Sequence, residues 1–430
     1  MQLVDTALAK RAADNRPIQV ALFGAGFSAR HIANQITRHV PGMRVAIVVN
    51  RTPEHAKSIL EQAGINGVRE ISRAQHLDEM IKTGQQCIAH DPDIVFYSRN
   101  IDAIIETTGT IEYGAKVALG ALSAHKHCIA LNCELDATLG PYLQQIATQN
   151  NVVYSNSDGD EPGVAMNLSR FVTTLGLKVV GAGNLKTFYD RYRTPTTQRE
   201  FANAHNQNPK AVTSFVDGTK LSMETTVLAN ALGFGVRKRG MLGPQSKDVR
   251  LCLEDFPSDT FSIADGVVDF LLGAAPNTGA FVIAYSEDPA QKAYLSYLKM
   301  GPGPFYVFHT PFHLPQLEVP ITVARAVLFN DATVAPKGAP SCEAVTMAKR
   351  TLPAGTVLDG LGGYDCYALI ERYSVGRAEN LLPMGLAEGC TLRKEIEKDQ
   401  AITFDDVILP GNRLIDSLYE KSVDLFSKYL

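Results

Sequence analysis

Acidic side chains are concentrated in the segment SNSDGDEPG, which holds Asp158, Asp160 and Glu161. Clustered carboxylates repel one another, so a loop of this kind binds a cation, receives a Lys or Arg, or raises a pKa for proton transfer. We therefore select Asp160 as a candidate catalytic acid or base. Either aspartate alone is equally consistent with a cap on the helix expected near Pro162 and Gly163.

A second polar segment, GNLKTFYDRYRTPTTQ, combines basic and hydroxyl side chains. Arg, Lys and Thr donors in a neutral-to-acidic protein are typical of a pocket for a carboxylate or phosphate. A solvated charged loop is the alternative interpretation. The predicted substrate-binding residues in this segment are Lys186, Arg191, Arg193, Thr196 and Thr197, and Lys186 is also a catalytic candidate.

A third segment, TSFVDGTKLSMETT, carries Asp217, Lys220 and Glu224. The pair Asp217-Gly218 indicates a turn. Lys220, two residues after Gly218, is predicted to donate a proton or stabilise an oxyanion during carbonyl reduction, because a buried Lys shifts its pKa readily. A surface lysine is the alternative, since Lys is rarely buried. Asp217 is assigned to substrate binding.

The segment Gly24-Ala25-Gly26-Phe27-Ser28-Ala29 matches the G-x-G-x-x-G/A dinucleotide-binding fingerprint. It follows an apolar strand pattern and opens a helical pattern, which is the required setting. Gly24 permits the tight turn, Gly26 lets the backbone approach a pyrophosphate, and Ala29 allows close packing of helix on strand. The N-terminus of the helix, including Phe27 and Ser28, would face the phosphates.

Residues at the ends of the following strands are predicted to complete the dinucleotide site. Asn50 and Arg51 stand where an Asp or Glu would accept from a free ribose 2′-hydroxyl, so NADPH is the expected cofactor, with Arg51 pairing to its 2′-phosphate. A solvated loop arginine is the alternative. Ligands of such folds lie outside the carboxyl ends of the strands. The nicotinamide half is therefore assigned to Thr107, Thr108, Gly109 and Asn132.

Composition and charge limit the class of protein. The 430 residues are 45% hydrophobic and 20% charged, as in ordinary globular proteins. The net charge of −4 provides no basic field for nucleic acid or anionic membranes. No apolar run is long enough to span a bilayer, and the N-terminus lacks the apolar core of a signal peptide. The seven dispersed cysteines fit a reducing compartment, so a cytoplasmic location is expected.

The elements that position these residues indicate an α/β protein with three parts. Strand patterns at 18–23, 43–49, 104–106 and 127–131 alternate with helical patterns, and a helix is expected over 1–13, which predicts a Rossmann-type parallel sheet in residues 1–163. Residues 164–337 are mixed, with long loops, and predict an α+β substrate-binding and dimerisation domain. Short strand signals with Gly and Pro turns predict a small β-rich domain at 338–430. A homodimer is expected from base rates for enzymes.

Taken together, the chain resembles homoserine-dehydrogenase-like proteins with a C-terminal SAF domain. The first domain carries the nucleotide-fold resemblance, and the segments AKRTLPAGTVLDGLGGY and LLPMGLAEGCTLRKEIEKDQAITFDDVIL carry the SAF resemblance. Homoserine dehydrogenases have a lysine after the strand-end Asn, whereas Cys133 and Glu134 follow Asn132 here, so homoserine oxidation is not expected.

The same group includes 1-deoxy-D-xylulose 5-phosphate reductoisomerase-like enzymes of isoprenoid biosynthesis. This resemblance implies NADPH-dependent rearrangement and reduction of a phosphorylated ketose to 2-C-methyl-D-erythritol 4-phosphate. It implies that the loop from Lys186 to Arg193 holds the phosphate, and it raises the possibility of Mg or Mn near Asp158 and Asp160. Two alternatives remain: an NAD(P)-dependent dehydrogenase or oxidoisomerase of a short or branched sugar acid, and a non-catalytic NADP-binding regulator.

Overall fold

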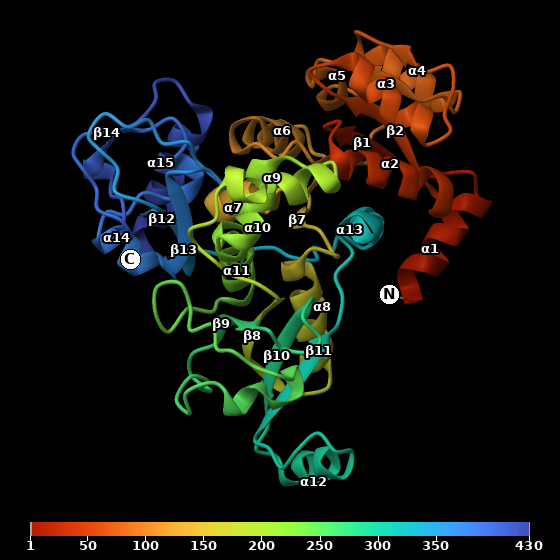
Figure 1. The fold of residues 1–430 in the computed structure, drawn as a ribbon. Coiled ribbons are helices and arrows are strands. Elements are labelled where there is room, and N and C mark those ends of the chain that lie inside the picture. Colours follow the sequence, from red (N-terminus) through yellow and green to blue (C-terminus); the bar gives the residue numbers. More distant parts are fainter. Residues whose placement is uncertain (1, 430) are drawn as a thin grey trace. The chain divides into compact units, whose positions relative to one another are not determined.

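The computed structural model describes residues 2–429 and contains two compact units (Figure 1). Unit 1 comprises the chain up to Asp160 together with Leu314–Ala335. Unit 2 comprises Glu161–His313 and the chain from Pro336 onward. The 338–430 segment, predicted as a separate domain, thus shares a unit with the 161–313 segment, and 314–335 joins the nucleotide-fold unit rather than the substrate domain.

Unit 1 is built on a seven-stranded parallel sheet in the order β3-β4-β2-β1-β5-β6-β7. The fold class predicted from the sequence is confirmed. The order places β1 at the point where the chain crosses from one half of the sheet to the other, which is where dinucleotides bind in such folds. The strands are β1 (Ile18–Phe23), β2 (Met43–Val49), β3 (Arg69–Glu70), β4 (Cys87–Ala89), β5 (Ala103–Glu106), β6 (His127–Ala130) and β7 (Tyr154–Asn156).

Helices pack on this sheet because their apolar faces repeat at helical spacing. In α2, for example, Ala29, Ile32, Ala33 and Ile36 are buried. Part of the core comes from the later segment, since Val319 and Val323 of α13 lie in the same cluster as the strands. The helices of unit 1 are α1 (Gln2–Ala13), α2 (Phe27–His39), α3 (Pro53–Gln62), α4 (Ala74–Lys82), α5 (Asp93–Phe96), α6 (Ile111–Ser123), α7 (Cys133–Gln149) and α13 (Pro315–Phe329). Met1, included in the predicted first helix, lies outside the described residues.

Unit 2 contains a four-stranded mixed sheet in the order β11-β10-β8-β9. The strands are β8 (Lys178–Lys186), β9 (Val267–Leu272), β10 (Ala280–Tyr285) and β11 (Phe305–Thr310). Helices α8 (Glu161–Thr174) and α11 (Thr219–Leu232) pack against each other and against β8. The end of β8 and the starts of α8 and α11 therefore meet, and this junction carries the polar side chains described below.

The remaining helices of unit 2 surround this core. α9 (Pro195–Ala204) and α10 (Pro209–Val216) precede α11 and pack together, whereas α12 (Pro289–Tyr297) lies beyond one end of the sheet with no buried residue (Figure 1). One 3₁₀ helix, η1 (Val249–Glu254), packs against β11. None of the helices among residues 2–429 has the length and apolar character needed to cross a bilayer.

The C-terminal part of unit 2 is rich in short strands, as expected. β12 (Cys342–Ala348) and β13 (Cys366–Arg372) form an antiparallel pair, and β14 (Thr391–Leu392) pairs with β15 (Val407–Ile408). Helical elements that the sequence analysis did not anticipate complete the segment: α14 (Tyr373–Ala378), η2 (Met384–Leu386), η3 (Phe404–Asp406), α15 (Leu414–Phe426) and η4 (Ser427–Tyr429). The sheet β12-β13 packs on α11.

Candidate functional site

The glycine loop of unit 1 joins β1 to α2 in the geometry that the fingerprint requires. Gly24 has a φ of +110°, a conformation that residues with a Cβ rarely adopt. A Cβ at Gly24 would also stand 2.8 Å from Thr107 Oγ1, at the end of the neighbouring strand β5. Only glycine fits this position: its positive φ suits the tight turn expected from the sequence, and its small size also permits the close approach of β1 to β5.

Gly26 precedes the first turn of α2, and its surroundings are open. A Cβ at Gly26 would meet no atom within 4 Å among the described residues, so protein packing does not demand a glycine there. Gly26 and Phe27 are exposed, and no side chain at the N-cap occupies the first amides of the helix. Free amides at an uncovered helix N-terminus suit a pyrophosphate. The loop therefore fits the nucleotide expected from the sequence, with Ser28 in the same first turn.

The ends of β5 and β6 use most of their polar groups within the protein. Thr107 donates from Oγ1 to the Phe23 carbonyl at 2.8 Å, and the Thr108 amide donates to Glu106 Oε1 at 2.6 Å. Gly109 is exposed and has a φ of +68°. Thr107 and Thr108 remain partly exposed at the carboxyl edge of the sheet, where a cofactor contact is still expected.

Asn132 makes several hydrogen bonds within unit 1, and its assignment to the nicotinamide half remains a prediction. Its Oδ1 accepts from the Leu135 amide and caps α7, while its Nδ2 donates to Glu106 Oε2 at 3.0 Å and to the Thr110 carbonyl. The side chain is 1% exposed. Asn132 therefore holds the ends of β5 and β6 together. Its partner Glu106 is fully buried, which raises the pKa of that carboxyl, and sequence reasoning did not select it.

The end of β2 presents the residues assigned to the ribose phosphate. Asn50 donates from Nδ2 to the Thr52 carbonyl at 2.9 Å and so shapes the turn that leads into α3. Arg51 is exposed immediately after the strand. The Arg51 side chain is thus accessible at the carboxyl edge of the sheet, as a contact with a phosphate requires. Its assignment to the 2′-phosphate remains a prediction.

Both carboxylate oxygens of Asp158 are already bound by other side chains of unit 1, which argues against a cation site there. Its Oδ1 accepts from Arg325 Nη1 at 2.9 Å, and its Oδ2 accepts from the hydroxyls of Thr322 and Thr333 at 2.9 and 2.6 Å. Asp158 is 2% exposed. Because the guanidinium already neutralises this carboxylate and would repel a metal ion, Asp158 tethers the loop to α13 and is a poor ligand for Mg or Mn.

Asp160 lies in a buried acidic environment. It is 7% exposed, and its charge contributes to raising the pKa of Asp136, a residue in the first turns of α7. Burial is the larger cause, and together the two effects raise the pKa of Asp136 to about 7. The acidic loop therefore does perturb a pKa, as the sequence analysis expected of clustered carboxylates, but the perturbed group is one that the sequence analysis did not select.

Unit 2 contains a second group of interacting polar side chains, which we call the acid–base centre. Lys186 Nζ lies 2.5 Å from Glu161 Oε2 and 3.3 Å from Glu224 Oε2. Asn184 donates from Nδ2 to the same two oxygens at 2.8 and 2.9 Å. Lys220 Nζ lies 3.8 Å from Glu224 Oε1. The centre comprises Glu161, Asn184, Lys186, Lys220 and Glu224.

The five members of the centre come from three elements of unit 2. Glu161 begins α8. Asn184 and Lys186 lie on the same face of the last residues of β8, and Lys220 and Glu224 are one helical turn apart on α11. The two glutamates are 3% and 5% exposed, whereas the two lysines are 18% and 19% exposed. The lysines are thus the solvent-accessible members of an otherwise buried cluster.

Proton affinities in the centre are strongly perturbed. Burial raises the pKa of Glu224 to about 8, and the neighbouring charge of Glu161 adds to this effect against the opposing charges of Lys186 and Lys220. Burial lowers the pKa of Lys186, but the two carboxylates outweigh it, so the net pKa is raised. At neutral pH the centre therefore holds protons on both Lys186 and Glu224, which is typical of sites that transfer protons.

The predicted anion loop is largely engaged within unit 2. Arg193 Nε donates to Asp190 Oδ2 at 3.1 Å, and its guanidinium stacks on Phe188. Thr197 exchanges hydrogen bonds with Thr194 in the capping box of α9, and Thr196 shares one with Tyr364. Arg191 is the exception. Its guanidinium lies over the rings of Tyr189 and Tyr367 and hydrogen-bonds with both side chains, so it is held by tyrosines rather than by a carboxylate.

Asp217, assigned to substrate binding, is fully buried in an ion pair. Its Oδ2 lies 2.9 Å from Lys349 Nζ, and its Oδ1 accepts from the Thr219 amide at 2.9 Å. Both oxygens therefore have partners within the protein. Burial and these partners favour a positioning role for Asp217, and its assignment to substrate contact remains a prediction.

Sequence reasoning identified the three polar segments but did not select the residues that make most of the contacts within the acid–base centre. Glu161 and Glu224 were noted within their segments yet not selected, and Asn184 was not noted as a functional residue. The available signal was the spacing of Asn184 and Lys186, which places both on one face of a strand, and of Lys220 and Glu224, which places both on one face of a helix.

Comparison with known proteins identifies part of the chain. Residues 159–319 match the family described as oxidoreductase DRL, catalytic domain. The matched segment includes every member of the acid–base centre and covers less than half of the chain. Together with the glycine loop at the switch point of a Rossmann-type sheet, this match shows the protein to be an NAD(P)-dependent oxidoreductase.

Other comparisons are distant. No curated protein matches the chain. Solved structures similar to it include an aldose-aldose oxidoreductase from Caulobacter crescentus complexed with glycerol, with 14% identity over 75% of this chain and 92% of that chain and a TM-score of 0.40. A myo-inositol dehydrogenase from Corynebacterium glutamicum has 11% identity over 73% and 86% of the two chains and a TM-score of 0.39. A levoglucosan dehydrogenase has 13% identity over 74% and 91% and a TM-score of 0.39.

Proposed function

We propose that the protein interconverts a carbonyl and an alcohol on a small hydroxylated substrate, a short or branched sugar or sugar acid, with NADPH as the preferred cofactor. The observation that carries this proposal is the acid–base centre, in which Lys186 is held between Glu161 and Glu224. Reduction of a carbonyl requires a hydride at carbon and a proton at oxygen. A nicotinamide cofactor would supply the hydride when bound, and the acid–base centre would supply the proton.

Lys186 is the proton donor in this proposal. Its ammonium is 18% exposed, so it can contact a substrate oxygen, while Glu161 fixes its position at 2.5 Å. Donation from Nζ to the carbonyl oxygen gives the alcohol and leaves a neutral amine. Protonated Glu224, 3.3 Å away, can then return a proton to Nζ. In the oxidative direction the same groups accept the proton from the alcohol.

The charge balance of the centre favours a hydroxylated substrate. With Glu224 protonated, the carboxylate of Glu161 offsets one of the two ammonium charges of Lys186 and Lys220, so the centre keeps only a single net positive charge. The cations predicted to bind a phosphate are also engaged, Lys186 by carboxylates and Arg193 by Asp190. Hydroxyl groups hydrogen-bond to a mixed set of acids and amines without a net countercharge. A sugar or sugar acid therefore fits the centre better than a dianionic phosphate ester does.

A second candidate is the reductoisomerase reaction, which converts 1-deoxy-D-xylulose 5-phosphate to 2-C-methyl-D-erythritol 4-phosphate. Arg191 favours it. This guanidinium contacts two tyrosine rings, so its charge remains available to an anionic group of a substrate. The same arginine could bind a sugar-acid carboxylate, so substrate turnover has to separate the two candidates.

Preference for NADPH is inferred from the end of β2. Arg51 is exposed there, at the position where NAD-specific folds carry an acidic residue for the ribose hydroxyls. A guanidinium can pair with the 2′-phosphate in a bidentate arrangement. A homodimer and a cytoplasmic location also remain predictions.

The test is NADPH consumption by the purified protein with a panel of keto-sugars and keto-sugar acids and, separately, 1-deoxy-D-xylulose 5-phosphate. Mg and Mn are each added and omitted. Turnover confined to unphosphorylated substrates supports the main proposal, and turnover confined to the phosphorylated ketose supports the second candidate. Lys186→Met should lower kcat by about 100-fold or more, the usual contribution of a general acid.

The matched control is Lys178→Met, which removes an exposed lysine from the opposite end of the same strand. It should leave kcat within about twofold of the unmodified protein. If Lys186→Met and Lys178→Met have the same kcat on an accepted substrate, or if neither class of substrate is turned over, the proposed function is wrong.

A further inference from the structure

The C-terminal segment of unit 2 lies outside the part of the chain that matches the oxidoreductase family. It nevertheless packs directly on α11, the helix that carries Lys220 and Glu224. Ser222 Oγ donates to the Ala368 carbonyl at 3.0 Å, and the Ala368 amide donates to Thr219 Oγ1 at 3.2 Å. Strand β13 thus binds the first turns of α11 through both polar groups of one of its residues.

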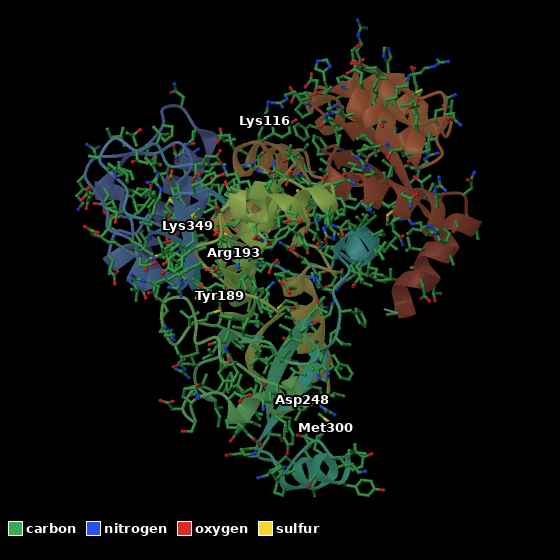
Figure 2. All side chains as sticks on the ribbon, in the orientation of Figure 1. Lys116, Tyr189, Arg193, Asp248, Met300 and Lys349 are labelled. Carbon is green, nitrogen blue, oxygen red and sulfur yellow. The ribbon has the colours of Figure 1, made fainter. Side chains whose placement is uncertain are left out.

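Lys349 makes the most complete connection between the two regions. It follows β12 directly, and its side chain is 3% exposed. Its ammonium donates to Asp217 Oδ2 at 2.9 Å, to the Arg193 carbonyl at 2.8 Å and to the Gly363 carbonyl at 2.7 Å. These three acceptors use all three N–H groups of the ammonium. Figure 2 shows Lys349 and Arg193 near each other.

Two of these acceptors lie on segments that lead to the acid–base centre. Arg193 belongs to the loop that begins just after Lys186, at the end of β8. Asp217 stands in the turn before α11, where its second oxygen accepts from the Thr219 amide and so fixes the start of the helix. One ammonium therefore links the loop that follows Lys186 to the helix that carries Glu224.

The turn and the loop also pack closely on each other. The Asp190 amide donates to the Val216 carbonyl at 2.8 Å. Gly218 has a φ of +89°, and a Cβ there would stand 2.3 Å from the ring of Tyr189. The loop and the turn consequently have little room to move independently while Lys349 is in place.

We propose that Lys349 is a positioning residue for the acid–base centre, supplied by the C-terminal segment, and that this segment is required for proton transfer. The proposal rests on the proposed function for the meaning of the centre. If Lys349 only stabilised the fold, any second substitution that restored stability would also restore activity. A positioning lysine is not replaceable in this way, because the hydrogen bonds to the Arg193 carbonyl and Asp217 set the distance between Lys186 and Glu224.

The first experiment compares Lys349→Met, Lys349→Arg and the neighbouring control Arg350→Met in the full chain. Arg350 also forms an ion pair, with Asp365, but its side chain is 53% exposed. Three quantities are measured for each protein: kcat on an accepted substrate, the pH dependence of kcat, and amide hydrogen exchange in residues 187–194 and 217–224. Hydrogen exchange reports the mobility of the loop and helix without requiring turnover.

We expect Lys349→Met to lower kcat at least tenfold, to shift the pH dependence that Glu224 sets, and to raise exchange in both segments. Lys349→Arg retains a charged donor and should recover part of each property, whereas Arg350→Met should resemble the unmodified protein. Unchanged exchange and an unchanged pH profile in Lys349→Met would overturn the proposal.

Breaking a buried ion pair can prevent folding, so a second variant is needed. The double variant Lys349→Met/Asp217→Leu replaces both charges with apolar side chains, which should restore thermal stability toward that of the unmodified protein. It cannot restore the hydrogen bonds to the Arg193 carbonyl and the Thr219 amide, so kcat should stay at least tenfold low and exchange should stay high. Recovery of kcat and of slow exchange together with stability would show that Lys349 is only structural.

The two proposals can fail separately. If the unmodified protein turns over no sugar or phosphorylated substrate, the proposed function fails, and the exchange data alone decide whether Lys349 holds the loop and helix. If turnover is present and depends on Lys186 but the Lys349 variants behave like Arg350→Met, the positioning proposal fails and the function stands.

Discussion

Lys186 and Glu161 form an ion pair of 2.5 Å although one residue ends a strand and the other begins a helix. The pair joins β8 to α8 at a point where solvent reaches only the lysine. Because Glu224 contacts the same ammonium, full ionisation would leave two buried carboxylates around one charge from Lys186. Burial and this repulsion together raise the pKa of Glu224 to about 8. Glu224 therefore holds a proton at neutral pH beside the partly exposed ammonium of Lys186.

Glu224 should therefore set the pH dependence of the reaction. Reduction uses the protonated form, so kcat for reduction should fall as the pH rises through about 8, and kcat for oxidation should rise over the same range. Glu224→Gln cannot titrate, so its profile should lose this change, and its kcat for reduction at pH 7 should drop by roughly 10- to 100-fold. The measurement is kcat from pH 6 to 10 in both directions.

The control for this experiment is Glu200→Gln, an exposed glutamate on α9. It should preserve both the profile and the rate. A change near pH 8 that persists in Glu224→Gln would assign the titration to another group and remove Glu224 from the proton-transfer role.

The two fingerprint glycines should respond differently to the same substitution. A Cβ at Gly26 meets only open space, so Gly26→Ala should change the free energy of unfolding by less than about 1 kcal/mol and yet weaken NADPH binding at least tenfold, because the methyl group occupies the pyrophosphate position. Gly24→Ala should instead destabilise the protein by roughly 1–3 kcal/mol, since its φ is +110° and Thr107 is too close.

Thermal unfolding without cofactor and fluorescence titration with NADPH measure the two effects separately. If Gly26→Ala binds NADPH as tightly as the unmodified protein, the open space beside Gly26 does not receive the pyrophosphate and the cofactor site has to be placed elsewhere.

Arg51 should determine the choice between NADPH and NADH. Arg51→Ala removes the only charge proposed to pair with the 2′-phosphate, so the Kd for NADPH should rise by about 10-fold or more, while the Kd for NADH stays within about twofold. Arg16→Ala, another exposed arginine of unit 1, serves as the control. An equal loss for both cofactors would indicate a general effect on the site, and no loss would show Arg51 to be a solvated surface residue.

Local patterns were sufficient to predict the nucleotide fold. β1 and β2 occur at the predicted residues because short buried apolar runs and glycine turns define them without reference to distant contacts. The glycine loop follows from the same local information. The helix expected near Pro162 and Gly163 already includes Glu161, whose carboxylate is used in the acid–base centre.

The acid–base centre could be predicted only in part. Its members come from three segments that the sequence marks as polar, but which member of each segment meets the others depends on tertiary packing. In the acidic loop, Asp158 pairs with Arg325, far along the chain, while Glu161 receives Lys186. Lys349 lies in the segment AKRTLPAGTVLDGLGGY, but nothing in its local sequence distinguishes a buried lysine with three acceptors from a surface one.

Asp136 provides a test of electrostatics in unit 1. It is 1% exposed, and burial, reinforced by the charge of Asp160, raises its pKa to about 7 from an ordinary value of 3.8. Between these two pH values the folded protein holds a proton that the unfolded chain has released. Stability therefore declines as the pH rises across this range, and the loss is complete above about pH 7.

Asp136→Asn removes this ionisation and keeps the shape of the side chain. The variant should gain stability relative to the unmodified protein as the pH rises from 4 to 8, by on the order of 2–4 kcal/mol over the whole range. Denaturant unfolding of both proteins at several pH values measures the difference, and Asp93→Asn, which alters an exposed aspartate, controls for the general change in charge. If the unmodified protein and Asp136→Asn lose stability in parallel across this range, Asp136 is already ionised in the folded state, and the buried polar cluster at the start of α7 must contain a positive or hydrogen-bonding partner that holds its charge.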